Sequence, residues 1–146
     1  MKVQLTDADY ELALGRPKHN NEEHRIAGYA VEEGLCREGI FKKGTRSEDV
    51  HGIDAWDGEE PQQVKSVENE HHNLRISDKN GHVHTVPECR YSLFHHDTHT
   101  AVARRIGYIM GHAIQELIDS ANPGVFKRTH GDIEHTYVHQ NLLQKD

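Results

Sequence analysis

The chain has 146 residues, of which 34% are hydrophobic, and it carries a formal net charge of −7 at pH 7. This length suits one domain over residues 1–146, and the low apolar content predicts a small core. No apolar run is long enough to span a membrane. The two cysteines lie far apart and no secretory leader is visible, so we expect a reduced protein of the cytoplasm.

Two helices are predicted near the N-terminus. Thr6 is a suitable N-cap for a helix over residues 7–14, and Asn21 for a second helix over residues 22–36. Glu23 lies at the edge of the apolar stripe of the second helix, where a half-buried carboxylate can face a functional site, and Glu22 is the second choice. The simpler explanation is that both acids complement the helix dipole in the first turn.

A β-hairpin is predicted over residues 50–67, because two short apolar-containing runs flank the turn signal Asp57-Gly58. Gln63 and Lys65 share one face of the second strand, since side chains alternate along a strand. If Asp54 of the first strand faces the same side, a carboxylate, an amide oxygen and an ammonium group converge. The two oxygens suit Mg²⁺, and the lysine can stabilise an anion or orient an attacking water.

The run Gly52-Ile53-Asp54, followed after eight residues by Gln63-Val64-Lys65-Ser66, resembles the active-site hairpin of the PD-(D/E)xK nuclease superfamily. The Q-x-K variant is similar to that of Mrr-type restriction endonucleases. The resemblance covers about one helix and one hairpin, and it implies that Asp54 and Gln63 bind the metal while Lys65 acts on the water or the phosphate. A helix before the hairpin often adds a glutamate in this family, and Glu23 is the candidate. Ile53 stands where the family has proline, and Gln63 replaces the commoner carboxylate.

The same resemblance implies an α/β (α+β) fold, with a restriction-endonuclease-like mixed sheet flanked by helices in the order α-β-β-β-α-β. It further implies a DNA endonuclease that hydrolyses phosphodiester bonds with Mg²⁺ or Mn²⁺, and a homodimer would suit double-strand cleavage. The net charge of −7 opposes DNA binding unless a local basic face offsets it. Residues 42–46 and Arg104-Arg105 are candidates for phosphate contacts, or are simply solvated.

A second hairpin is predicted over residues 74–86, with its turn at Asn80-Gly81. His82 and His84 share a face of its second strand, as a metal-binding pair does, although two solvated histidines are the commoner outcome.

Helices are predicted for much of the C-terminal third. The spacing of Val102, Ile106 and Ile109 indicates a long core helix over residues 98–120, capped by Asp97 or Thr98. Gly107 and Gly111 in it allow another element to approach closely. A short strand is predicted at residues 125–128, and a last helix at residues 132–143.

Two other functions remain open. The histidines could assemble a zinc or iron site, although none of their spacings is diagnostic; they are His82 and His84, then His95, His96 and His99, then His135 and His139. The chain could also be an acidic, non-enzymatic interaction protein, which its net charge favours over a nucleic-acid binder.

Overall fold

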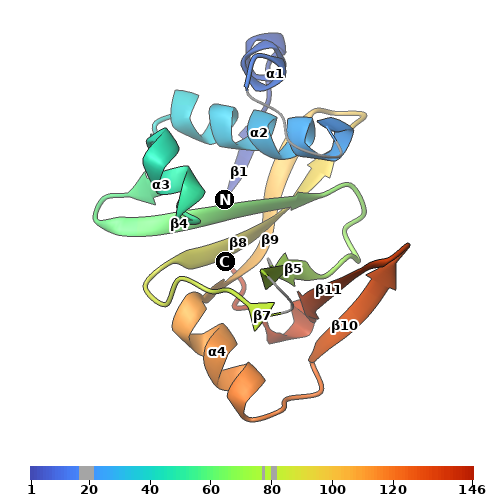
Figure 1. The fold of residues 1–146 in the computed structure, drawn as a ribbon. Helices are drawn as coiled ribbons and strands as arrows, with labels where there is room; N and C mark the ends of the chain where they lie inside the picture. Colours follow the sequence, from blue (N-terminus) through green and yellow to red (C-terminus); the bar gives the residue numbers. More distant parts are fainter. Residues whose placement is uncertain (17–21, 77, 80–81) are drawn as a thin grey trace.

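The computed structural model describes residues 1–16, 22–76, 78–79 and 82–146, which form an α/β fold (Figure 1). The first two predicted helices are present as α1 (Asp7–Leu14) and α2 (Glu22–Arg37). The side chain of Thr6 accepts a hydrogen bond from the backbone N–H of Asp9, and the Asp9 side chain accepts one from the Thr6 N–H. This reciprocal cap explains why α1 begins where the sequence predicts.

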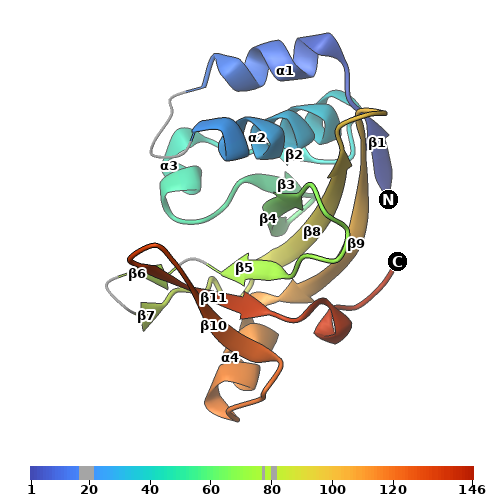
Figure 2. The same cartoon turned by 90° about the vertical axis from the view of Figure 1, so that its right-hand side faces the viewer.

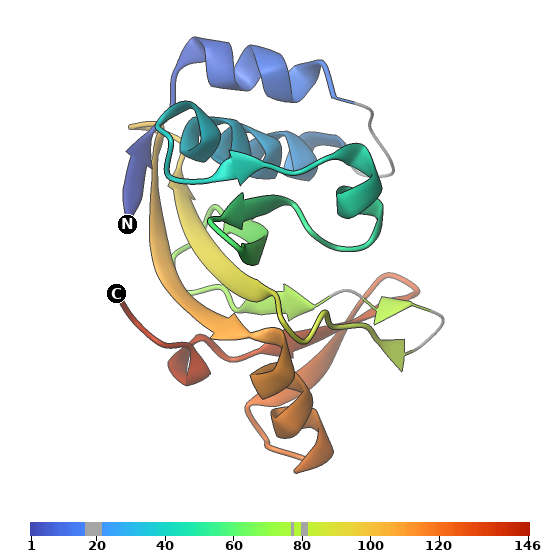
Figure 3. The ribbon, with the colours of Figure 1, turned by 90° about the vertical axis from the view of Figure 1, so that its left-hand side faces the viewer.

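A six-stranded mixed sheet is the centre of the fold, and Figures 2 and 3 show that it is strongly curled. The strand order is β1-β9-β8-β4-β3-β2. Neighbours pair antiparallel except β4 and β8, which are parallel. The strand bounds are β1 (Lys2–Gln4), β2 (Lys42–Lys43), β3 (Ala55–Asp57), β4 (Glu60–Val67), β8 (Arg90–Asp97) and β9 (Val102–Met110).

A smaller, three-stranded antiparallel sheet in the order β10-β11-β5 lies below the curled sheet in Figure 1. Helix α3 directly precedes β3 in the chain. The remaining bounds are α3 (Arg46–Val50), β5 (Leu74–Ile76), β6 (Asp78–Lys79), β7 (His82–Val83), α4 (Gly111–Asp119), β10 (Val125–His130), β11 (Ile133–Val138) and the 3₁₀ turn η1 (Gln140–Leu142).

Two apolar clusters cover the two faces of the large sheet. Phe94 belongs to the cluster that α2 covers, which includes Val31 and Leu35. Its neighbour Leu93 points to the opposite face and belongs to the cluster that contains Ile114 of α4. The alternation of side chains along β8 therefore gives the chain two small cores. Each is covered by different elements.

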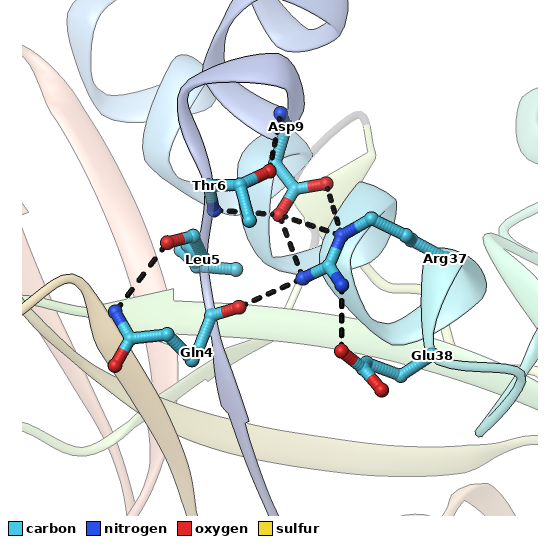
Figure 4. A network of polar contacts seen from close by, with 6 residues as sticks. All are labelled: Gln4, Leu5, Thr6, Asp9, Arg37 and Glu38. Atoms are coloured by element: carbon cyan, nitrogen blue, oxygen red, sulfur yellow. Dashed lines mark hydrogen bonds and ion pairs between the residues drawn. The ribbon is translucent and has the colours of Figure 1, made fainter.

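The N-terminal segment is tied to the end of α2 by a polar network (Figure 4). The guanidinium of Arg37 donates to both carboxylate oxygens of buried Asp9, and also to the carbonyl oxygen of Gln4 at 2.7 Å. Burial alone would raise the pKa of Asp9, but the hydrogen bonds from Arg37 and from the Thr6 N–H lower it below the usual range. The network fixes β1 and α1 against α2.

The predicted helix over residues 98–120 is wrong. Residues 90–110 form the hairpin β8–β9, and only Gly111–Asp119 is helical. Asp97 does not cap a helix, because its carboxylate accepts from the backbone N–H groups of His99 and Thr100 in the hairpin turn. The same local bonds form at an N-cap and in a turn, which is why the sequence was ambiguous. A register shift at Leu93/Phe94 also disturbs the alternation between the two strands.

The predicted last helix over residues 132–143 is also wrong. Residues 133–138 are strand β11, and only Gln140–Leu142 forms a 3₁₀ turn. Gly131 has φ +62° and makes the tight turn between β10 and β11. Thr136, Tyr137 and Val138 are residue types that favour strands, and they pair with both β10 and β5.

The second predicted hairpin is present in part. The short strands β6 and β7 pair antiparallel, but β5 pairs with β11 instead of with the segment after the turn. The turn residues 80–81 and the side chain of His82 lie outside the described part of the chain. In the described residues, no helix is long and apolar enough to cross a bilayer. Cys36 and Cys89 are both free thiols.

Candidate functional site

The hairpin β3–β4 forms as the sequence predicts, with Gly58 at its turn in a positive-φ conformation. Its first strand is shorter than expected, because residues 46–50 are helix α3. Asp54 therefore lies directly before β3, where the two strands part. Its backbone N–H still donates to the Gln62 carbonyl at 2.9 Å, and its carboxylate Oδ2 accepts from the backbone N–H of Val64 at 2.8 Å.

Three carboxyl groups gather around this point. Burial raises the pKa of Asp54 to about 7, and a hydrogen bond with Asp49 of α3 acts in the same direction. The hydrogen bond from Val64 and the charge of Lys65 oppose the rise. Burial also raises the pKa of Glu32 of α2 well above its usual range, and the nearby Asp54 raises it further. The group combines buried Glu32, half-buried Asp54 and exposed Asp49, and it has an excess of potential negative charge.

Two basic side chains form ion pairs with the carboxylates of α2. Arg16 pairs with Glu32 at 3.1 Å and with Glu33 through a hydrogen bond of 2.6 Å, and Lys43 pairs with Glu33 at 2.6 Å. Burial would raise the pKa of Glu33, but Lys43 and Arg16 lower it below the usual range. Glu33 is therefore held as a charged structural partner, whereas the cation near Glu32 does not overcome its burial.

Gln63 and Lys65 occupy one face of β4, as predicted. Gln63 is 9% exposed, and its amide nitrogen donates to the carbonyl oxygen of Gly52 at 3.1 Å. Because the nitrogen makes this bond, the amide oxygen is the atom of Gln63 that can serve as a ligand. Lys65 is half-buried, and its charge lowers the pKa of Asp54. The structure thus brings Asp54 and Lys65 into electrostatic contact, with Gln63 two positions before Lys65 along the strand.

The predicted helix glutamate is the least defined part of the site. Glu23 lies within α2, but its side chain and that of Glu22 fall outside the described residues. Glu32, which the sequence analysis did not single out, is the buried carboxylate of α2 that interacts with Asp54. One signal could have identified it, because Glu32 and Glu33 lie between the apolar residues Val31 and Leu35 of the helix stripe, and all of residues 31–35 are buried.

The described histidines do not come together in a group of three or more metal-ligating side chains, as the zinc or iron hypothesis requires. His95 and His96 are consecutive in β8; His95 lies 3.1 Å from the Glu68 carbonyl oxygen and buried His96 lies 2.7 Å from the Tyr10 hydroxyl. His135 belongs to β11, and His139 caps η1 by accepting from the Asn141 N–H. His135 and His139 therefore do not share a helical face.

Within the described residues, no three His, Cys, Asp or Glu side chains are arranged to hold a metal ion by themselves. Two shallow depressions lie around Trp56 on the outer side of the hairpin, and Asp54, Gln63 and Lys65 line neither.

The basic residues expected to contact phosphate have protein partners. Arg104 pairs with Glu70 at 3.5 Å, and Arg105 pairs with Asp146 and lies over the ring of Tyr108. The basic segment 42–46 contains β2 and the start of α3, and Thr45 is the N-cap of α3.

Comparison of the chain with protein-family models, with curated proteins and with solved structures finds no match.

Proposed function

We propose that this protein is a metal-dependent endodeoxyribonuclease that hydrolyses phosphodiester bonds, with its site at the divergence of β3 and β4. The observation that carries the proposal is the half-buried carboxylate of Asp54, whose pKa is raised to about 7 beside buried Glu32 and exposed Asp49. Carboxylates are rarely crowded together without a function, because each opposes the ionisation of the others.

The donor set suits Mg²⁺ or Mn²⁺. These ions prefer oxygen ligands, and Mg²⁺ commonly takes only one or two protein carboxylates while water and substrate phosphate complete its shell. Asp54 and the amide oxygen of Gln63 are the proposed ligands. Glu32 is the proposed helix carboxylate, in the role for which the sequence suggests Glu23. When bound, the metal would supply Lewis-acid stabilisation of the phosphate and lower the pKa of a water.

The chain's own groups have separate roles in this proposal. Lys65 stabilises the negative charge that develops on the phosphate and orients the attacking water. The hydrogen bond from the Val64 N–H holds the Asp54 carboxylate in place. Arg16 fixes Glu32 from the other side. A rigid arrangement of this kind reduces the reorganisation that the reaction would otherwise require.

The finer fold assignment belongs to the same proposal. Helix α2 packs beside the β3–β4 hairpin, and the hairpin belongs to a mixed sheet, which supports a restriction-endonuclease-like core. The observed order departs from the expected one, because β2 and α3 stand between α2 and β3, and β9 stands between β8 and α4. The segment between β4 and β8 holds β5, β6 and β7, and β10 joins the small sheet instead of the large one.

The test is cleavage of supercoiled plasmid and of duplex and branched oligonucleotides, with Mg²⁺ or Mn²⁺ and with chelator. We expect nicking or cutting that requires the metal. Lys65→Ala should reduce the rate by at least about 100-fold, since positioned charge of this kind contributes that much in other hydrolytic sites. Lys127→Ala is the matched control, because Lys127 is an exposed lysine on β10, a strand of the small sheet.

A folded wild-type protein that cleaves none of these substrates would contradict the proposal. Equal activity of Lys65→Ala and Lys127→Ala would show that any cleavage arises elsewhere or from a contaminant.

A further inference from the structure

The outer face of the small sheet carries an unusual set of side chains. We call it the aromatic face, and it is defined by the described side chains that alternate outward on β5, β10 and β11: Arg75, Phe126, Arg128, Ile133, His135 and Tyr137. The opposite face contributes Leu74, Ile76 and Val138 to the apolar core. The aromatic face therefore points away from that core.

Register places five of its six members in two rows across the strands. Arg75, Tyr137 and Phe126 are directly paired neighbours, and Arg128 is paired with His135 in the next row. The rings of Phe126 and Tyr137 are stacked, with centroids 5.8 Å apart and planes 19° apart. The Arg128 guanidinium lies 5.2 Å from the centroid of Phe126. Both arginines are exposed, and both rings are half-buried.

The charge of this face is opposite to that of the whole chain. The net charge is −7, yet the described side chains of the aromatic face include two arginines and no carboxylate. A ligand that approaches here meets positive charge together with stacked aromatic rings. Bases stack on such rings irrespective of sequence, while arginines contact the phosphates between them.

We propose that the aromatic face binds single-stranded nucleic acid, with bases stacked against Tyr137 and Phe126 and phosphates bound by Arg75 and Arg128. A duplex is the poorer ligand, because its bases are already stacked on one another and do not present their faces to the rings. The inference rests on the proposed nuclease function and adds that the substrate has an unpaired strand.

Figures 2 and 3 place the strands β6 and β7 and the turn between β10 and β11 on the same side of the molecule as α3, which carries Asp49. One end of the small sheet therefore lies on the side of the molecule that carries α3.

The test is fluorescence anisotropy with a labelled oligothymidylate of about 15 nucleotides, close to the site size of known single-strand binders. The buffer contains chelator, so that no cleavage occurs. We expect the single strand to bind more tightly than a duplex of equal length. Arg75→Gln and Arg128→Gln should each weaken binding about fivefold or more and reduce the salt dependence by about one phosphate contact.

Two further variants separate stacking from charge. Tyr137→Leu keeps an apolar side chain but removes the ring, and it should weaken single-strand binding about tenfold. Lys127→Gln is the matched control, because Lys127 is exposed on the same strand as Arg128 but on the opposite face. It should change affinity by less than about twofold. Circular dichroism melting confirms that each variant is folded.

The inference is overturned if Arg128→Gln and Lys127→Gln behave alike, if duplex binds as well as single strand, or if the wild type binds neither. Concentration-dependent self-association that Tyr137→Leu abolishes, without oligonucleotide binding, would identify the face as a protein interface instead. Binding without cleavage would refute the proposed function alone, whereas Lys65-dependent cleavage unaffected by changes at Arg75, Arg128 and Tyr137 would refute this inference alone.

Discussion

Asp54 is held in a place that favours its protonated form. Its pKa is about 7 in the folded chain, compared with 3.8 for an unperturbed aspartate. Between these two pH values the unfolded chain releases the proton while the folded chain retains it, so stability decreases as pH rises through this window. Above this window, the free energy of unfolding stays lower by the full cost of ionising Asp54 in the folded chain. A bound metal ion or a neutral side chain at this position would remove that cost.

Asp54→Asn tests this directly in the presence of chelator. Asparagine is uncharged and can still accept the hydrogen bond from the Val64 N–H. We expect the variant to exceed the wild type in unfolding free energy by about 2 kcal/mol at about pH 8, and by much less at about pH 4. Urea denaturation at the two pH values measures the difference.

Asp57→Asn is the matched control, because Asp57 is an exposed aspartate of β3. Its unfolding free energy should stay within about 0.5 kcal/mol of the wild type at both pH values. An equal gain for Asp54→Asn at both pH values would mean that charge is not the cause.

At the scale of elements, Gly111 joins β9 to α4 at a point of close contact. A Cβ atom built there would overlap the backbone carbonyl of Val86. Backbone cannot move aside as a flexible side chain can, so Gly111→Ala should destabilise the protein by about 3 kcal/mol or more. Thermal unfolding followed by circular dichroism gives the size of the loss.

Gly28→Ala is the opposite case. Its Cβ would lie 3.6 Å from Ser66 Oγ, an ordinary contact, and Gly28 is inside α2. Alanine has the higher helix propensity, so this variant should gain about 0.5 to 1 kcal/mol. A Gly111→Ala protein as stable as Gly28→Ala would show that the approach of Val86 does not constrain this junction.

The elements that could be predicted are those with local signals. Thr6 caps α1, and the Asp57-Gly58 turn joins β3 to β4, both within a few residues. The prediction failed over β9, where Val102, Ile106 and Ile109 have helical spacing but belong to a strand. Pairing with β8, which lies earlier in the chain, decides that segment, and this pairing is not readable from the spacing of apolar residues.

The residues of the candidate site likewise include some that local sequence predicts and some that it does not. The hairpin motif predicted Asp54, Gln63 and Lys65, and the structure places Asp54 near Lys65. Glu32 and Asp49 were missed, because their approach to Asp54 depends on how α2 and α3 pack against the sheet. Tertiary packing of this kind leaves little trace in local sequence.

At the scale of the whole molecule, metal binding at the proposed site should stabilise the fold. A ligand that binds only the folded state adds about 1.4 kcal/mol at tenfold excess over its dissociation constant, which corresponds to a rise in Tm of about 4 to 5 °C for a chain of this size. We expect saturating Mg²⁺ to raise the Tm of the wild type and of Asp57→Asn, but not of Asp54→Asn. A scan of Tm against Mg²⁺ concentration measures this. Equal shifts in all three proteins would place the bound metal elsewhere.

The parallel pairing of β4 with β8 also has a consequence for the order of folding. Residues 68–89 must cross from the end of one strand to the start of the other before the two can pair. The hairpin β3–β4 can form early from local contacts, but one edge of β4 stays open until residues 90–97 are available. Long-range closures of this kind are slow steps. During synthesis, the strand that carries Gln63 and Lys65 is therefore complete in sequence well before it is fixed in the sheet.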